Sequence, residues 1–310
     1  MSIHEHLTTF HGLPVHMAGD PGAPPSDQAA WGISTDSLEE SGQSFQSALD
    51  ETLSQLDPGR VKALVIGYWG PGWENVTSSV AVSALTGAAS RLTALEAIFL
   101  GDITSEESEI SWIEHGDITP LLESFPRLRR LEVRGGSGLV LRPVRHAALE
   151  VLRFESGGLP GRVVRAVGES DLPVLRTLEM WLGEENYGGD SRPEDWAGVL
   201  AGAGLPALVE LGLQDSQIQD DVAAAVAAAP IVARLEELNL SMGILTDAGA
   251  EALLSGQPLT HLRRLDLSHH YVSEAMRKRL LAALDGVEVD LGDPQDGDDD
   301  DGWRYIAVSE

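Results

Sequence analysis

Two adjacent histidines, His269 and His270, follow an apolar run in the stretch "HLRRLDLSHHYV". Imidazole nitrogens are common metal ligands, so the pair is a candidate transition-metal site. Consecutive residues at the end of a strand point to opposite faces of a sheet, so the two rings do not easily converge on one ion. We therefore predict a scaffold role without bound metal, in which His270 is directed inward and bonded to neighbouring backbone and His269 is exposed.

A second candidate for chemistry is the segment 102–117, "DITSEESEISWIEHGD", which concentrates acidic residues and a histidine. Its oxygen donors could hold a hard cation or supply paired carboxylates for acid/base catalysis. The spacing matches neither the calcium-loop pattern nor the zinc motif HExxH, and Ile110, Trp112 and Ile113 favour an ordered, partly buried insertion. We expect a structural or interaction role, with a metal-assisted enzyme as the alternative. The clustered side chains are Asp102, Glu106, Glu107, Glu109, Glu114, His115 and Asp117.

The composition limits the class of partner. Of the 310 residues, 21 are basic and 49 acidic, so 21 minus 49 gives a net charge of -28, which repels nucleic acid. The chain has no cysteine, which excludes disulfides, thiolate metal sites and cysteine nucleophiles. The first residues lack a basic stretch followed by an apolar one, and no run of about 18 apolar residues occurs, so we expect a cytoplasmic protein without membrane contact.

Short apolar triplets recur along the chain, as in "LTALEAIFL", "FPRLRRLEV", "LPVLRTLEM" and "LTHLRRLDL". Each triplet alternates apolar and other residues with the period of a strand that buries one face. The recurrence predicts parallel strands in a repeat protein. The last apolar residues of the predicted strands are Ile33, Ile66, Leu100, Val133, Phe154, Met180, Leu213, Leu240, Leu267 and Val289.

Helical stretches separate the triplets, for example at 44–57, 220–230 and 246–256. The second and third begin near Asp residues that we expect to act as N-caps, and Ser273 is a candidate cap of a further helix. A unit this short cannot bury its own apolar face, so successive units must stack with strands on one side and helices on the other.

The sequence resembles leucine-rich repeat proteins of the ribonuclease-inhibitor-like class, whose pattern is LxxLxLxxNxL. The resemblance implies an α/β horseshoe-shaped solenoid with a parallel β-sheet on the concave side and helices on the convex side. The pattern is carried by Leu208, Leu211, Leu213 and Ile218, by Leu235, Leu238, Leu240 and Leu245, and by Leu262, Leu265, Leu267 and Val272. This sequence departs from the family at the Asn position, which holds Gly136, Gly157, Gly183, Ser216, Gly243 and His270.

The segment "FLGDITSEESEISWIEHGDITPLLE" and the closing "WRYIAV" are similar to a family of bacterial cytoplasmic leucine-rich repeat proteins without an assigned activity. This resemblance implies a setting beside radical-enzyme genes, and hence an enzyme of the same pathway as a partner. The predicted organisation is an N-terminal capping region at 1–59 with a first strand and helix, repeats at 60–292, and an acidic linker with a C-terminal capping strand at 293–310.

In this class, the residues between and beside the buried triplet positions face outward on the concave sheet. They predict a basic island toward the middle, an acidic stretch toward the C-terminal end, and aromatic contacts, with the loop after Trp181 as a further contact surface. The predicted partner-binding residues are Phe99, Arg130, Glu132, Arg134, Arg153, Glu179, Trp181, Glu210, Glu237 and Asp266. The charges could instead merely keep an exposed sheet solvated, and Trp181 could pack under its own loop.

These observations predict a non-enzymatic scaffold that binds a protein or peptide with basic patches, without a cofactor, metal or catalytic residue. Besides the metal-assisted enzyme, an inhibitor of a basic nuclease is an alternative that rests on analogy with the founding members of the class.

Overall fold

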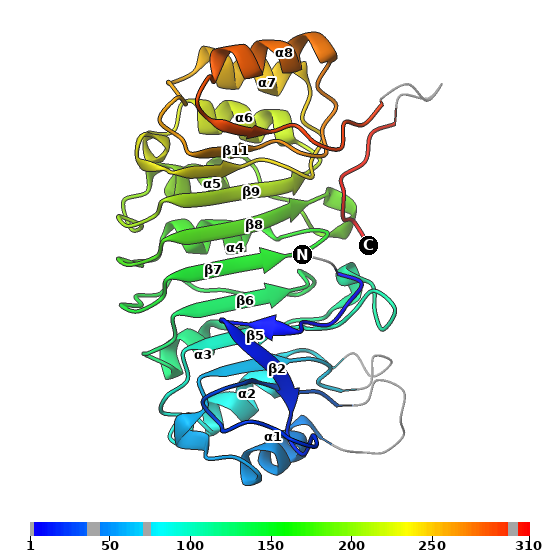
Figure 1. Ribbon diagram of the computed structural model, residues 1–310, viewed down its shortest axis with the longest axis vertical. Coiled ribbons are helices and arrows are strands. Elements are labelled where there is room, and N and C mark those ends of the chain that lie inside the picture. Colours follow the sequence, from blue (N-terminus) through cyan, green and yellow to red (C-terminus); the bar gives the residue numbers. More distant parts are fainter. Residues whose placement is uncertain (1–2, 36–43, 71–75, 297–302) are drawn as a thin grey trace.

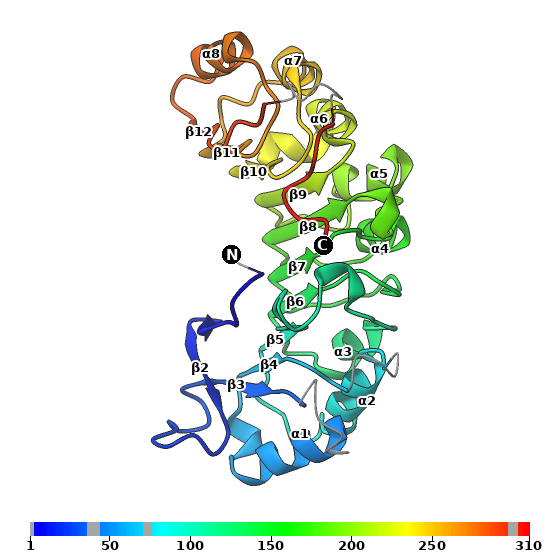
Figure 2. The same cartoon turned by 90° about the vertical axis from the view of Figure 1, so that its right-hand side faces the viewer.

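The structure is a computed structural model that describes residues 3–35, 44–70, 76–296 and 303–310. Its open sheet contains twelve strands in sequence order, and helices alternate with them along the chain (Figure 1). The helices lie on one side of the sheet, and we call the other side the helix-free face (Figure 2). This arrangement is a repeat-type α/β solenoid, as the triplet recurrence predicts.

The strands of the sheet are β1 (Thr9–Phe10), β2 (Leu13–Met17), β3 (Ala30–Ile33), β4 (Ala63–Ile66), β5 (Ala97–Leu100), β6 (Arg130–Arg134), β7 (Val151–Glu155), β8 (Thr177–Gly183), β9 (Glu210–Ser216), β10 (Glu237–Asn239), β11 (Arg264–Asp266) and β12 (Glu288–Asp290). The helices are α1 (Phe45–Ser54), α2 (Ser79–Gly87), α3 (Thr119–Ser124), α4 (Gly161–Gly168), α5 (Pro193–Ala201), α6 (Gln219–Ala227), α7 (Asp247–Ser255) and α8 (Glu274–Ala283). β1 and β2 pair antiparallel, and all the other neighbouring strands pair parallel.

The strands predicted from the triplets are confirmed as β3 to β12, and most are in the predicted register. The last apolar residues pair directly with one another from Ile33 on β3 through to Leu213 on β9. The final unit is an exception, because Val289 pairs with Leu265 and not with Leu267. The prediction was wrong by two residues because "VEVDL" is apolar at 287, 289 and 291, and a slip of two keeps every side chain on the same face.

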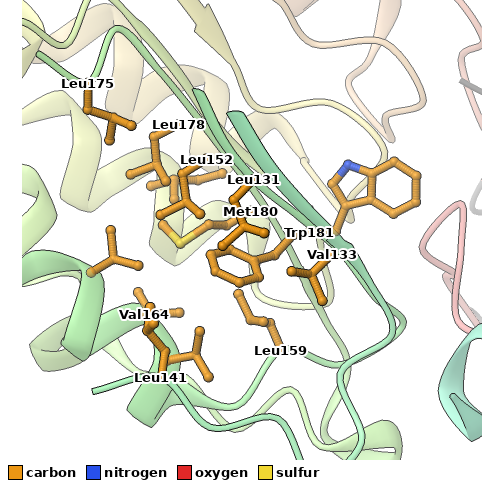
Figure 3. Close-up of a cluster of buried hydrophobic side chains, with 14 of the residues drawn as sticks. Leu131, Val133, Leu141, Leu152, Leu159, Val164, Leu175, Leu178, Met180 and Trp181 are labelled. Atoms are coloured by element: carbon orange, nitrogen blue, oxygen red, sulfur yellow. The ribbon is translucent and has the colours of Figure 1, made fainter. Parts of the chain in front are cut away.

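The core lies between the sheet and the helices. Figure 3 shows Leu131, Leu152 and Leu178 from neighbouring strands on the side of the sheet that faces Val164 of α4. All of these side chains are buried. Burying a leucine side chain stabilises the fold by about 2 kcal/mol, and each triplet contributes two or three such residues, so stacking of neighbouring units is what stabilises each of them.

Glycine occupies turns after several strands because these turns pack backbone against backbone. A Cβ on Gly183, whose φ is +68°, would lie 1.9 Å from the carbonyl oxygen of Gly157. A Cβ on Gly136 would lie 2.3 Å from the carbonyl oxygen of Gly158. No side chain, asparagine included, fits at such distances.

The helix starts are linked from one repeat to the next. The carboxylate of Asp220 on α6 accepts hydrogen bonds from Thr246 N (2.8 Å), Thr246 Oγ1 (2.6 Å) and Gly249 N (3.0 Å) at the start of α7. The carboxylate of Asp247 on α7 likewise accepts from Ser273 N and Oγ, both at 2.7 Å. Ser273 is the N-cap of α8, as predicted, whereas the predicted Asp caps were wrong: Ile218 and Thr246 occupy the N-cap positions of α6 and α7.

The N-terminal segment folds onto the helix-free face. Phe10 packs with Ala30, Val65 and Phe99 from the strands β3 to β5, and β2 pairs parallel with β3 at the edge of the sheet. Leu7 N donates to the carboxylate of Asp102. The N-terminal region therefore covers a face as well as an end.

The C-terminal segment 303–310 forms no strand, so the predicted capping strand was wrong. It crosses the carboxyl ends of several strands, from His269 after β11 toward Gly157 after β7 (Figure 2). Its backbone amides make single hydrogen bonds and no β-ladder: Ala307 N donates to Met242 O (2.8 Å) and Val308 N donates to Asp215 Oδ1 (3.0 Å). Residues 297–302 of the predicted acidic linker lie outside the described residues.

Within the described ranges, none of the helices has the length and apolar character needed to cross a membrane.

Candidate interaction surface on the helix-free face

Strand register brings the predicted contact residues together in rows on the helix-free face. Because alternate residues of a strand share a face, residues that pair across strands form one line of side chains. The central row runs Phe99, Glu132, Arg153, Glu179, Gly212, Asn239, Asp266 and Asp290. The sequence predicts an outward-facing surface along the whole length of this row, but burial of the side chains divides the row into a covered and an open part.

The N-terminal part of the row is covered. Phe99 was predicted to be exposed, and this prediction was wrong. Its side chain is fully buried, and the ring of Phe10 meets it edge-on with centroids 5.8 Å apart. The guanidinium of Arg134 lies 5.3 Å from the Phe99 centroid. The prediction failed because Phe10 reaches Phe99 from a distant part of the chain, and a strand pattern carries no sign of such a contact.

The predicted basic island is a neutralised ion-pair network. Arg134 and Glu155 are fully buried, with Arg134 Nε 2.8 Å from Glu155 Oε2. Arg153 Nε lies 3.1 Å from Glu155 Oε1 and 3.2 Å from Glu179 Oε2, and Arg130 bonds to the buried Glu132. Each arginine has a carboxylate partner, so no basic surface results.

Burial also affects the Glu132 carboxyl of this network. It raises the pKa of the Glu132 carboxyl above its usual range, against the opposing positive charges of Arg130 and Arg153. A buried ion pair costs much of its Coulomb energy in lost hydration, so these groups hold their neighbours in one arrangement more than they add net stability. Glu132 and Arg134 are therefore structural residues, and only the half-buried Arg130 and Arg153 reach the surface.

Trp181 is buried as well, contrary to the prediction of an exposed aromatic. Figure 3 shows its ring on the opposite side of the strands from Met180 and Leu178, so it does project from the helix-free face. Its exposed fraction is only 2%, and the guanidinium of Arg153 lies 5.7 Å from its ring centroid. The Trp181 ring is therefore covered by neighbouring side chains of the helix-free face and is not exposed to solvent.

The C-terminal part of the face is open and acidic. A hollow of about 70 Å³ is lined there by four of the predicted residues, Glu179, Glu210, Glu237 and Asp266, together with Leu211, Gly212, Leu238, Asn239 and Arg264. We call this site the acidic hollow. It lies on β8 to β11, where the strand rows place carboxylates side by side. Four carboxylates and the guanidinium of Arg264 line it, and Arg153 and Arg263 pair with Glu179 and Glu237 from outside, so an excess of one negative charge remains.

Some of these carboxylates are already held in place by neighbours. Thr177 Oγ1 donates to Glu210 Oε2 (2.7 Å), and Arg263 bonds to Glu237 from outside the hollow. Arg264 NH2 lies 3.0 Å from Asp266 Oδ2. These contacts fix the orientation of the carboxylates. Arg264 lies within the hollow, whereas Arg263 approaches Glu237 from outside it.

Gly212 lines the hollow, and its lack of a side chain lets neighbouring side chains lie close to its backbone. A Cβ at this position would lie 2.7 Å from Gln214 Oε1 and 3.3 Å from Glu179 Cγ. Gln214 is 5% exposed, and among the described residues its Oε1 has no hydrogen-bond partner although its Nε2 donates to Ser241 Oγ. A buried acceptor without a donor is costly, so this oxygen favours a donor that arrives from outside.

The two histidines behave largely as predicted. His270 is fully buried, its Nδ1 accepts from Val272 N (3.0 Å), and its Nε2 lies 3.3 Å from Leu291 O. Burial lowers the pKa of His270. His269 is half-buried and not exposed, because Asp293 Oδ2 lies 3.0 Å from its Nδ1 and Tyr305 O lies 3.3 Å from its Nε2. The two rings have separate structural partners.

The carboxylates of 102–117 do not all converge on one point, although Asp102 and Glu107 lie 3.3 and 3.4 Å from the two ring nitrogens of His6. Asp102 accepts from the backbone of Leu7, Glu107 accepts from Thr104 N (2.8 Å), and Asp117 accepts from Thr119 N (2.9 Å). His115 is a core residue whose Nε2 lies 2.9 Å from Arg134 O, and burial lowers its pKa to about 4. In the parts of the chain that the structure describes, no three His, Cys, Asp or Glu side chains are grouped as they would be around a metal ion.

Two determinants of the acidic hollow were not predicted. Gly212 occupies the centre of a strand, where glycine commonly marks a gap or a close approach, and this signal could have indicated the hollow. Arg264 also lines the hollow, and its pairing with Glu288 and Asp290 depends on the two-residue register shift of β12.

A crystal structure of a Bacteroides fragilis protein is similar to this fold, with a TM-score of 0.79 and 30% sequence identity over 90% of this chain and 76% of that one. No protein-family model matches the sequence, and no curated protein is similar to it.

Proposed function

This chain belongs to the same family as the Bacteroides fragilis protein, and we propose that it is a non-enzymatic binding protein that holds a basic protein or peptide on the helix-free face of its sheet. The acidic hollow is the observation that carries this proposal. It combines carboxylates held at fixed positions with the backbone of Gly212, and the unpaired buried acceptor of Gln214 lies next to Gly212. An arginine or lysine side chain would supply both the positive charge and the missing donors.

We further propose that the solenoid is a leucine-rich repeat horseshoe of the ribonuclease-inhibitor-like class, with the helix-free face on its concave side. The LxxLxL spacing and the helix that accompanies most strands support this class. In such a fold, the concave face is the surface that a partner can contact through several repeats at once.

A comparison of two double variants tests the binding proposal. Glu210→Gln with Glu237→Gln removes two charges from the hollow and retains the size of both side chains. Asp221→Asn with Glu274→Gln removes the same charge from α6 and α8 on the helix side. Proteins retained from native lysate should be bound about tenfold less by the hollow variant, as expected for about 1.4 kcal/mol of lost interaction.

The helix-side variant should retain the same proteins as the wild type, as judged by quantitative mass spectrometry. Equal retention by the two double variants would remove the acidic hollow from the proposal, because bulk charge alone would then explain binding. Partners that are acidic proteins would contradict it as well, since their charge would oppose that of the hollow.

A further inference from the structure

Trp112 is presented to solvent at the carboxyl edge of the sheet. It ends the 3₁₀ turn η3 (Ile110–Trp112) and is 71% exposed, although the flanking Ile110 and Ile113 are buried. The segment is anchored on both sides, because Thr104 N donates to Glu107 Oε2 and the buried His115 lies 2.9 Å from Arg134 O. The fold therefore holds a large aromatic side chain outward on a fixed backbone. Exposed tryptophans in such positions are typical binding hot spots.

A cleft of about 530 Å³ begins at Trp112. One wall consists of Ser111, Trp112 and Glu114, and the other of Asn186, Tyr187 and Asp190 from the loop after β8. Gly136 and Gly138 also line it, so its base is largely backbone. A second hollow of about 360 Å³ is lined by residues 105–109 and by Trp112. Trp112 therefore borders both depressions.

The charges around Trp112 are mostly negative. Glu114 and Asp190 line the cleft, and Glu106, Glu107 and Glu109 line the second hollow. Arg162 is the opposing cation, and its guanidinium is already engaged, because Nε and NH2 donate to Leu139 O at 3.1 and 3.0 Å. Five carboxylates against one guanidinium leave an excess of four negative charges.

The Tyr187 ring faces the same negative environment. A hydrogen bond with Glu310 and the nearby charges of Glu184 and Glu109 raise the pKa of Tyr187 to about 12. The phenol therefore stays protonated and adds no charge of its own at neutral pH. The site offers two aromatic faces within an acidic surround.

We propose that the cleft at Trp112 binds an arginine-bearing peptide segment of a partner protein. A planar guanidinium can stack on an indole and bond to carboxylates in the same pose, which an ammonium group matches less well. The chain uses this chemistry internally, because arginines lie over the rings of Phe10, Phe99, Trp181 and Tyr271 at 5.3 to 5.7 Å. A second copy of this chain is a poor occupant, since each copy carries a charge of -28.

Fluorine NMR of the full chain with 5-fluorotryptophan at its tryptophans tests the proposal. Trp112→Phe identifies the Trp112 resonance, and Trp303→Phe identifies that of Trp303, which is 66% exposed and serves as the matched control. The probe is the blocked peptide Gly-Arg-Gly-Arg-Gly, compared with its lysine counterpart. The Trp112 resonance should shift and saturate with the arginine peptide, with about fivefold weaker binding of the lysine peptide, while the Trp303 resonance stays unchanged.

The variant Glu210→Gln with Glu237→Gln keeps this test separate from the acidic hollow. The Trp112 titration should be the same in that variant as in the wild type. A Trp112 resonance that does not move would overturn the proposal, as would equal affinity for the arginine and lysine peptides, which would indicate attraction by charge alone. A Trp112 shift that depends on protein concentration without peptide would also overturn it, because it would identify a second copy as the occupant.

Discussion

Asp215 is an acid that the fold buries against the C-terminal segment. It is the penultimate residue of β9 and has a φ of +54°, and its Oδ1 accepts a hydrogen bond from Val308 N. Burial raises the pKa of this carboxyl well above its usual range, and the Val308 amide only partly opposes the rise. The folded state therefore favours the neutral acid.

Replacement of Asp215 by asparagine should stabilise the protein at neutral pH by on the order of 1 kcal/mol. Asparagine keeps an oxygen for Val308, tolerates a positive φ and carries no charge. For an acid with a raised pKa, stability is fully present below the unfolded-state pKa and is lost as the pH rises through the folded-state pKa, so the advantage of D215N should vanish below about pH 4. Urea unfolding across this range measures it, and a D215N protein less stable than wild type at neutral pH would contradict the assignment.

Side-chain hydrogen bonds link consecutive helices of the solenoid at their N-terminal ends. Asp220 bonds to the first residues of α7. Its neighbour Asp221 is exposed, and among the described residues its carboxylate has no hydrogen bond or ion pair. Asp220→Ala should lower the free energy of unfolding by about 1–3 kcal/mol, because it removes charge-assisted bonds to backbone and hydroxyl donors. Asp221→Ala is the matched control and should change it by less than about 0.5 kcal/mol. Equal effects in denaturant unfolding would show that the link between α6 and α7 contributes nothing.

The strands could be predicted from the sequence because each depends on its own neighbours in the chain. An apolar-x-apolar triplet buries one face wherever it lies, so β3 to β12 and most of their register followed from spacing. Register failed at β12, where "VEVDL" fits two alignments equally well.

Exposure on the helix-free face could not be predicted in the same way. Phe99 and Glu132 have the strand pattern of outward-facing residues, yet both are buried. Phe10, which is far from Phe99 in the chain, packs against its ring, and Arg130 and Arg153 lie beside Glu132. Burial of an outward position depends on segments that fold back from elsewhere. The acidic residues of the hollow are open to solvent, as predicted, because no other segment of the described chain covers that part of the row.

At the scale of the whole molecule, the charge of -28 predicts opposite effects of salt on stability and on binding. Most acidic groups repel one another across solvent, so added sodium chloride should raise the melting temperature, with about 2–4 °C for each 1 kcal/mol of relieved repulsion. The buried pair of Arg134 and Glu155 is screened little and should not offset this gain. The same salt should weaken the binding of the arginine peptide, since that attraction crosses solvent before contact. Thermal unfolding and peptide titration at matched salt concentrations measure both slopes. A melting temperature that falls with salt would contradict this prediction. It would mean that attraction within exposed ion pairs contributes more to stability than repulsion among the excess acidic groups subtracts from it.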